Sequence, residues 1–190
     1  LIEHNYKVHS YISPHLECIN ERFFISNKNI SDKKLYKVLQ YIEIVNNKEP
    51  ITFFEITTVA AFYLFNKIKA DFLILEVGLG GRFDATNVIQ KSIIDIITPI
   101  SFDHQEYLGK KLKKITNEKL GIIKKSSSII IGKQRPVILK YISKKLIKFK
   151  NNKIFFGKNL KIFHTKNTKF TLNLNNKIYK FNIPSLIGNH

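Results

Sequence analysis

Apolar residues along the chain alternate between short continuous runs and longer stretches with helical spacing. Residues 72–77 form a short apolar run whose one carboxylate is Glu76, and the run leads into a bend with glycines at 78, 80 and 81. Such runs are typical of parallel strands that are covered by helices on both faces. We therefore expect a buried strand that ends in a ligand-binding loop, since ligands of open α/β sheets lie beyond the carboxyl ends of the strands.

The same patterning predicts strands and helices in alternation along residues 1–152. Ser31 and Thr52 stand where they can cap the first two helices. The expected strands are 6–12, 22–25, 71–77, 92–100 and 128–131, and the expected helices are 32–45, 53–68, 112–123 and 136–149. This alternation predicts an α/β fold with a doubly wound, mostly parallel sheet.

The pattern changes after residue 152. Short apolar stretches at 154–156, 160–164, 169–174 and 178–183 read as strands, and Asn175-Asn176 suits a hairpin turn between the last two. We expect a small antiparallel β element over 153–185 within the same domain, followed by the start of a further helix at 186–190. Because the chain has no methionine and both ends fall within expected elements, we interpret it as an internal fragment.

The formal net charge of +18 suggests a nucleic acid or an anionic membrane as a partner. Among the 32 basic residues, however, only Arg22, Arg82 and Arg135 are arginine, which base-reading sites favour. No stretch reaches the roughly 20 apolar residues that span a bilayer. We expect neither partner, and a basic nucleic-acid-binding module is kept as the alternative from another class.

Cysteine usage bears on the compartment. Cys18 is the only cysteine, so the chain has no internal disulfide, which favours a cytoplasmic protein. No base stands beside Cys18 in the sequence, and we expect a small buried residue rather than a nucleophile.

Polar side chains follow three of the expected strands at the point where each ends. They are Ser13, Glu76 and the pair Asp103-His104. Because the carboxyl ends of parallel strands share one edge of a sheet, a hydroxyl, a carboxylate and an imidazole there predict a divalent-cation site, with magnesium or manganese favoured. Three ordinary loop residues are the alternative. His15 could face the same crevice.

The glycine-rich bend does not match the dinucleotide fingerprint, because Phe83 stands where G-x-G-x-x-G requires its third glycine. Its glycines instead suit a backbone that approaches a ligand, with Arg82 supplying positive charge and Asp84 accepting hydrogen bonds. A plain structural turn is an equal alternative. Lys119 lies among apolar residues of an expected helix, a setting for a reactive amine, although an ordinary solvated lysine is the simpler interpretation.

Several motifs occur in a fixed order along the chain. They are Ser13-Pro14-His15-Leu16, Asn20-Glu21-Arg22, Thr52-Phe53-Phe54-Glu55, Leu75-Glu76-Val77-Gly78-Leu79-Gly80-Gly81-Arg82, Asp84-Ala85-Thr86-Asn87, Asp103-His104, Leu108-Gly109, Glu118-Lys119, Gly121-Ile122 and Leu186-Ile187-Gly188-Asn189-His190. In this order they resemble the folylpolyglutamate synthase and dihydrofolate synthase family of the Mur ligase superfamily. The resemblance implies the fold of the Mur ligase central domain, which is similar to that of P-loop NTPases.

The resemblance also implies an activity: an ATP-dependent ligase that joins L-glutamate to dihydropteroate, to a reduced folate, or to both. The acceptor carboxylate is phosphorylated, and the amine of glutamate attacks the acyl phosphate. By resemblance, Mg²⁺ is bound by Ser13, Glu76 and His104, of which His104 is also a catalytic candidate, and Lys119 is the lysine that becomes carbamylated. The residues implied for the pterin site are Thr52, Phe53, Phe54, Asp84 and Ala85, with His15, Arg82 and Asn87 as further candidates.

The chain departs from the family pattern at Ile12, Phe83 and Leu120, and Leu120 could crowd Lys119. The phosphate-binding loop expected before Leu1, and the carboxyl-terminal domain, are not in this sequence, so we expect the fragment alone to be inactive. We expect a monomer. A muramyl-peptide ligase of the same superfamily is the alternative within the resemblance.

Overall fold

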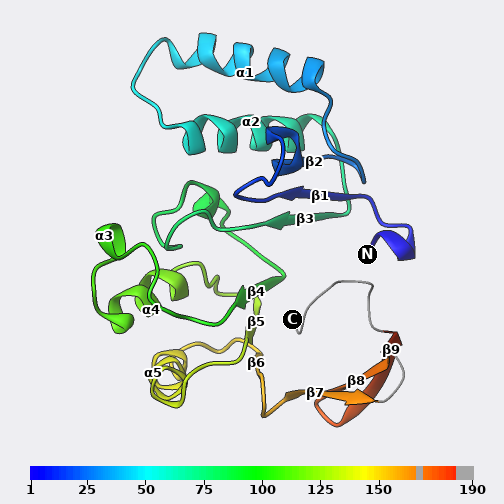
Figure 1. The fold of residues 1–190 in the computed structure, drawn as a ribbon, viewed down its shortest axis with the longest axis vertical. Coiled ribbons are helices and arrows are strands. Elements are labelled where there is room, and N and C mark those ends of the chain that lie inside the picture. The colour runs from blue at the N-terminus through cyan, green and yellow to red at the C-terminus, as the bar shows by residue number, and fades with distance from the viewer. Residues whose placement is uncertain (166–168, 183–190) are drawn as a thin grey trace. The chain divides into compact units, whose positions relative to one another are not determined.

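The computed structural model describes residues 1–165 and 169–182. The chain divides into two compact units, Leu1–Ile89 and Gln90–His190, and each has its own hydrophobic core (Figure 1). The first unit contains β1 (Val8–Tyr11), β2 (Phe23–Phe24), α1 (Asp32–Asn46), α2 (Phe53–Lys67) and β3 (Phe72–Leu75), with the 3₁₀ helices η1 (Ile2–His4), η2 (Ile19–Arg22) and η3 (Ala85–Val88).

The sheet of the first unit has the strand order β2-β1-β3. Strand β1 is parallel to β3, with Tyr11 opposite Leu75, and antiparallel to β2. The parallel pairing extends one residue further, because the backbone N–H of Glu76 donates to the carbonyl of Tyr11 at 2.9 Å. The carboxyl ends of β1 and β3 therefore lie at the same edge of this sheet.

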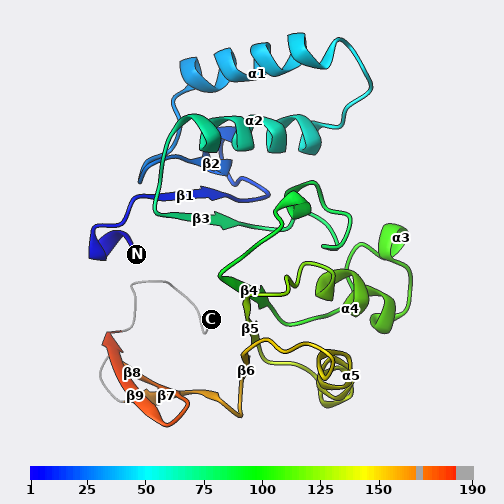
Figure 2. The ribbon, with the colours of Figure 1, turned by 180° about the vertical axis from the view of Figure 1, so that it is seen from behind.

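Helices α1 and α2 run side by side, and α2 lies between α1 and the sheet (Figures 1 and 2). Helix α1 begins after Ser31, as expected, although the Ser31 side chain makes no capping bond, and it ends where Asn47 adopts a left-handed conformation. Thr52 caps α2 in a capping box with Glu55. Small residues such as Ala60 and Ala61 are buried in the core of this unit, where they allow close packing.

One expectation about β3 is wrong. Its residues Leu73 and Ile74 are 38% and 48% exposed, although the apolar run predicts a strand covered on both faces. The reason is positional: β3 is an edge strand of its sheet, whereas α2 packs mainly over β1. Only the end of the strand, at Leu75, packs against the core.

Residues 94–155 of the second unit form three parallel strands connected by helices. They are β4 (Ile94–Ile97), α3 (Gln105–Leu108), α4 (Leu112–Leu120), β5 (Ser128–Ile131), α5 (Pro136–Leu146) and β6 (Lys153–Phe155). The strands form a sheet in the order β4-β5-β6. The expectation that residues 154–156 belong to the antiparallel element is therefore wrong, because this stretch pairs in parallel with β5 and so extends the parallel sheet by one strand.

A separate antiparallel sheet follows, formed by β7 (Leu160–Thr165), β8 (Lys169–Leu174) and β9 (Lys177–Asn182). Asn175 and Asn176 join β8 to β9, and both have positive φ angles, 49° and 66°, as a two-residue type I′ hairpin requires. The α/β class with parallel strands and a small antiparallel element is thereby confirmed. The expected helix start at 186–190 lies outside the described residues.

Candidate functional site

Ser13 and Glu76 lie beside each other at the edge of the sheet where β1 and β3 end. The backbone N–H of Ser13 donates to Oε2 of Glu76 at 2.7 Å. This bond brings a hydroxyl-bearing residue and a carboxylate from opposite ends of the first unit's sequence to one place. The other carboxylate oxygen of Glu76 makes no hydrogen bond within the described part of the chain.

The loop after Ser13 is held by the carboxylate of Glu21, which lies in one of the ordered motifs but is not among the predicted site residues. Glu21 accepts hydrogen bonds from the backbone N–H groups of Leu16, Glu17 and Cys18 at 2.8–2.9 Å. These donors, with that of Leu16 having the largest effect, lower the pKa of Glu21 from 4.5 to about 2. Cys18 is exposed, contrary to expectation, because its part in this loop is to present its backbone to Glu21.

Arg22 connects the same loop to the start of α2. Its Nε–H donates to Nδ1 of His15 at 2.9 Å, and its guanidinium carbon lies 5.3 Å from the centre of the Phe53 ring. Since Nδ1 of His15 accepts this bond, the ring proton of neutral His15 lies on Nε2. His15, a predicted site residue, is thus joined to Phe53, a residue predicted for the pterin site.

The start of α2 is rigidly built. Thr52 donates through both its backbone N–H and its hydroxyl to Oε2 of Glu55, and these bonds, the hydroxyl first, lower the pKa of Glu55. Phe54 packs against Tyr11, with ring centres 5.9 Å apart, and lies directly over Gly78. A Cβ at Gly78 would come 2.4 Å from the Phe54 ring, so any larger residue there would force the ring or the bend to shift.

The bend after β3 is organised by Asp84. One carboxylate oxygen accepts from the backbone N–H of Leu79 at 2.8 Å, and the other accepts from the N–H and hydroxyl of Thr86. Asp84 is buried, so in this structure its carboxylate shapes the loop that precedes Ala85. Asn87 donates to the carbonyl of Arg82 at 2.9 Å, which closes the same turn.

His104 and Lys119 belong to the second unit. His104 is exposed, has a left-handed backbone (φ 45°), and lies 3.5 Å from the Asp103 carboxylate. Lys119 is half-buried in the last turn of α4. The side chain of the neighbouring Leu120 packs against the hydrophobic core of this unit.

The loop that carries His104 is fixed by Gln134, which sequence reasoning missed. The Gln134 side chain accepts from the N–H of Ile100 at 3.0 Å and donates to the carbonyl of Thr98 at 2.8 Å. The N–H of Gly132 also donates to the carbonyl of Ile97 at 2.8 Å. The loop after β5 thus clamps the loop after β4, and no local sequence signal marks this long-range contact.

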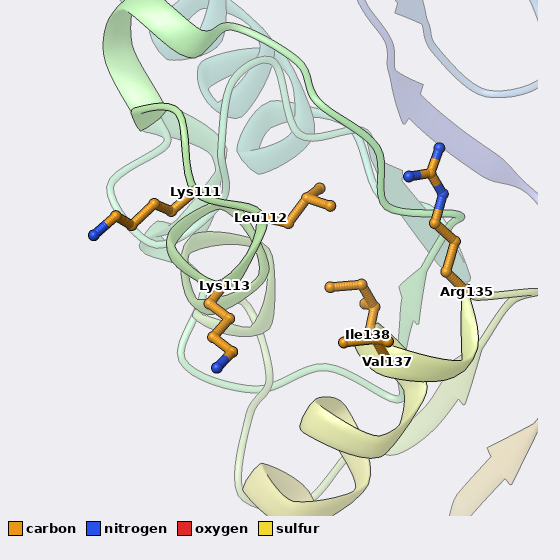
Figure 3. A pocket seen from close by; sticks show the side chains of 6 residues that line it. All are labelled: Lys111, Leu112, Lys113, Arg135, Val137 and Ile138. Carbon is orange, nitrogen blue, oxygen red and sulfur yellow. The ribbon is translucent and has the colours of Figure 1, made fainter.

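A shallow pocket of about 500 Å³ lies between the starts of α4 and α5, lined by Lys111, Leu112, Lys113, Arg135, Val137 and Ile138. The side chains of Leu112 and Ile138 extend into the space between the two helices, whereas the ammonium groups of Lys111 and Lys113 extend away from the other lining residues (Figure 3). None of the predicted site residues lines this pocket, so the pocket is not evidence for the predicted site.

Ser13 and Glu76 suit a magnesium ion, because a hydroxyl and a carboxylate are hard oxygen donors and are brought together here. Within residues 1–165 and 169–182, no group of three or more His, Cys, Asp and Glu side chains could hold a metal. The predicted set has two such residues, Glu76 in the first unit and His104 in the second. No helix in the described part of the chain is long and apolar enough to cross a membrane.

Comparison with known proteins gives consistent results. The family model described as Mur ligase middle domain matches residues 25–190. The dihydrofolate synthase/folylpolyglutamate synthase of Haemophilus influenzae is 41% identical over 133 residues, which is 70% of this chain and 30% of that protein.

Two solved structures are similar over most of the chain. "E. coli FolC in complex with DHPP and ADP" has a TM-score of 0.80 at 28% identity and matches 92% of this chain and 41% of that one. "FPGS-AMPPCP-folate complex" has a TM-score of 0.81 at 26% identity and matches 91% of this chain and 45% of that one. This chain thus spans less than half the length of the relatives it matches.

The family match covers most of the chain, and the α/β elements and parallel strands described above agree with it. The chain belongs to the Mur ligase middle-domain family, with dihydrofolate synthase/folylpolyglutamate synthase proteins among its relatives.

Proposed function

We propose that these residues are part of an ATP-dependent ligase that joins L-glutamate to dihydropteroate, to a reduced folate, or to both. The observation that carries the proposal is the pairing of Ser13 with Glu76 at the ends of two parallel strands, beside Phe54 and the Gly78 bend. The names of the relatives, which include complexes with ADP, with DHPP and with folate, support the same substrates.

The proposed reaction has two steps. An oxygen of the acceptor carboxylate attacks the γ-phosphorus of ATP, and ADP leaves. The glutamate amine then loses a proton and attacks the acyl carbon, and inorganic phosphate leaves with the bridging oxygen. Phosphorylation is needed because a carboxylate by itself has no good leaving group.

Ser13, Glu76 and His104 are the residues proposed to hold Mg²⁺, which when bound supplies positive charge that offsets the charge of the phosphoryl group. The bond from the Ser13 N–H keeps the Glu76 carboxylate oriented before any ligand arrives. Lys119 is the candidate for carbamylation: its neutral amine would add to carbon dioxide and lose a proton, giving an anion.

The acceptor is proposed to bind at the surface that the start of α2 and the bend after β3 form together. Phe53 and Phe54 offer aromatic faces directly after Thr52, Ala85 begins η3, and Asp84 holds the shape of the bend. Arg82 and Asn87 are further candidates on that bend. We propose that the protein acts as a cytoplasmic monomer.

The test is product formation by the natural full-length protein that contains these residues. With Mg²⁺, ATP, glutamate and dihydropteroate, we expect one ADP for each glutamate amide formed. A parallel assay with a reduced folate as acceptor separates the two activities. Failure of the wild-type protein to form an amide with either acceptor would contradict the proposal.

A further inference from the structure

Arg22 is a buried cation that has no acidic partner in the described part of the chain. The residue is only 8% exposed. No Asp or Glu carboxylate lies within 4.0 Å of its guanidinium in the described residues. Buried arginines are ordinarily paired with a carboxylate, since an uncompensated charge is costly away from water. The side chain is nevertheless fixed, by its bond to His15 and by the Phe53 ring.

The Nη end of Arg22 is not completely shut off from solvent, although the residue as a whole is buried. In the described part of the chain, every side-chain nitrogen or oxygen that is shut off from solvent has a hydrogen-bond partner. The two Nη atoms of Arg22 have none there, so neither is completely shut off from solvent. A guanidinium whose Nη groups have no partner among the described residues is suited to a carboxylate, which it can bind through two parallel hydrogen bonds.

The surroundings indicate the rest of the ligand. Phe53 is 55% exposed beside the guanidinium and offers a face on which a planar ring can stack. His15 donates through its Nε2–H, because its Nδ1 is occupied by Arg22. The features together describe a site for an aromatic acid rather than for an inorganic anion.

We infer that Arg22 binds the carboxylate of the aromatic acid substrate, with Phe53 stacking against its planar part. The inference rests on the proposed function for the identity of the acid, dihydropteroate. It goes further by assigning the recognition of the carboxylate to one residue.

The test compares binding of dihydropteroate with binding of its neutral carboxamide, by calorimetry on the full-length protein without ATP or glutamate. The wild type should prefer the acid by about 10- to 100-fold, the range for a hydrogen-bonded charge pair. Arg22→Gln should remove the preference, and Arg22→Lys should keep part of it. Lys34→Gln is the control, because Lys34 is exposed and its replacement removes one positive charge from the same unit. This variant should keep the preference for the acid unchanged. If a substitution only disturbed the structure, it would lower the affinity for the acid and for the carboxamide by the same factor.

A second measurement needs no replacement of Arg22. The sequence has only three arginines, so these residues give at most three Nε–H signals in an NMR spectrum, and Arg82→Lys and Arg135→Lys identify the other two. The acid should shift the Arg22 signal, and the carboxamide should leave it in place. An equal response to both ligands, or a wild-type protein without preference for the acid, overturns the inference. Amide formation is measured separately, so failure of the proposed function is distinguishable.

Discussion

Glu76 is the side chain on which the proposed chemistry depends most directly. Glu76→Gln keeps an oxygen that can accept from the Ser13 N–H but removes the negative charge that a magnesium ion needs. We expect turnover to fall by about 100-fold or more, the scale of losing a group that stabilises the transferring phosphoryl group, with an unchanged melting temperature.

Glu3→Gln is the matched control, because Glu3 is an exposed carboxylate in η1, outside the proposed site. Its turnover should equal that of the wild type. Wild-type turnover in the Glu76→Gln protein would exclude Glu76 from metal binding.

Glu21 makes a prediction about pH. Its pKa is lowered to about 2 in the folded loop, so its hydrogen bonds stabilise the loop fully above the ordinary value of 4.5 and are lost as the pH falls toward 2. The backbone amides of Leu16, Glu17 and Cys18 should therefore shift together in NMR spectra over this window. Glu21→Gln should remove that pH dependence. Titration of Glu21 at its ordinary value would contradict this account of the loop.

Individual site residues could be predicted from the sequence where their type and their place after a strand marked them. Residues whose role depends on burial or on distant partners could not. Ser13 and Glu76 follow predicted strands, and the structure brings them together. Arg22 is one of three arginines, but only the folded chain shows that it has no acidic partner within residues 1–165 and 169–182. Glu21 and Arg22 fall within one of the ordered motifs, which was the only signal that could have marked them.

At the scale of elements, the start of α2 and the bend after β3 act as one packed unit. Gly78→Ala would place a Cβ against the Phe54 ring and should destabilise the protein by about 1–3 kcal/mol, as overpacking does. Phe54→Leu removes that ring, so the double variant should be more stable than the sum of the two single effects predicts. Urea unfolding of the four proteins measures this coupling. Additive changes in the free energy of unfolding would show that residues 54 and 78 are not in contact.

The contact between the loops after β4 and β5 should depend on the side chain of Gln134. Gln134→Ala leaves the N–H of the buried Ile100 without its acceptor, which should cost about 1–3 kcal/mol and speed hydrogen exchange at that amide. Gln134→Glu keeps the acceptor and should protect Ile100 better than alanine does. Gln40→Ala, which removes an exposed bond to Tyr36, is the control. Unchanged exchange at Ile100 in the alanine variant would contradict the clamp.

Elements whose signals are local were predicted well. The Asn175-Asn176 turn and the Thr52 cap depend on a few adjacent residues, and both are present as expected. The partner of β6 and the exposure of β3 depend on which strands lie beside them, which the local pattern does not encode.

At the scale of the whole molecule, the order of the motifs was more informative than composition. The formal charge of +18 suggested anionic partners without distinguishing among them. The ordered motifs predicted the family that the Mur ligase middle-domain match confirms over residues 25–190. The grouping into two units, each with its own core, could not be predicted, because it depends on contacts between distant residues.

In the proposed reaction, a carboxylate oxygen of the acceptor is phosphorylated by ATP. Dihydropteroate labelled with ¹⁸O in both carboxylate oxygens tests it directly in the full-length protein, with the released phosphate and the amide analysed by mass spectrometry. We expect one ¹⁸O in inorganic phosphate for each amide formed, while the amide keeps the other. Amide formation with both labels absent from phosphate would contradict it.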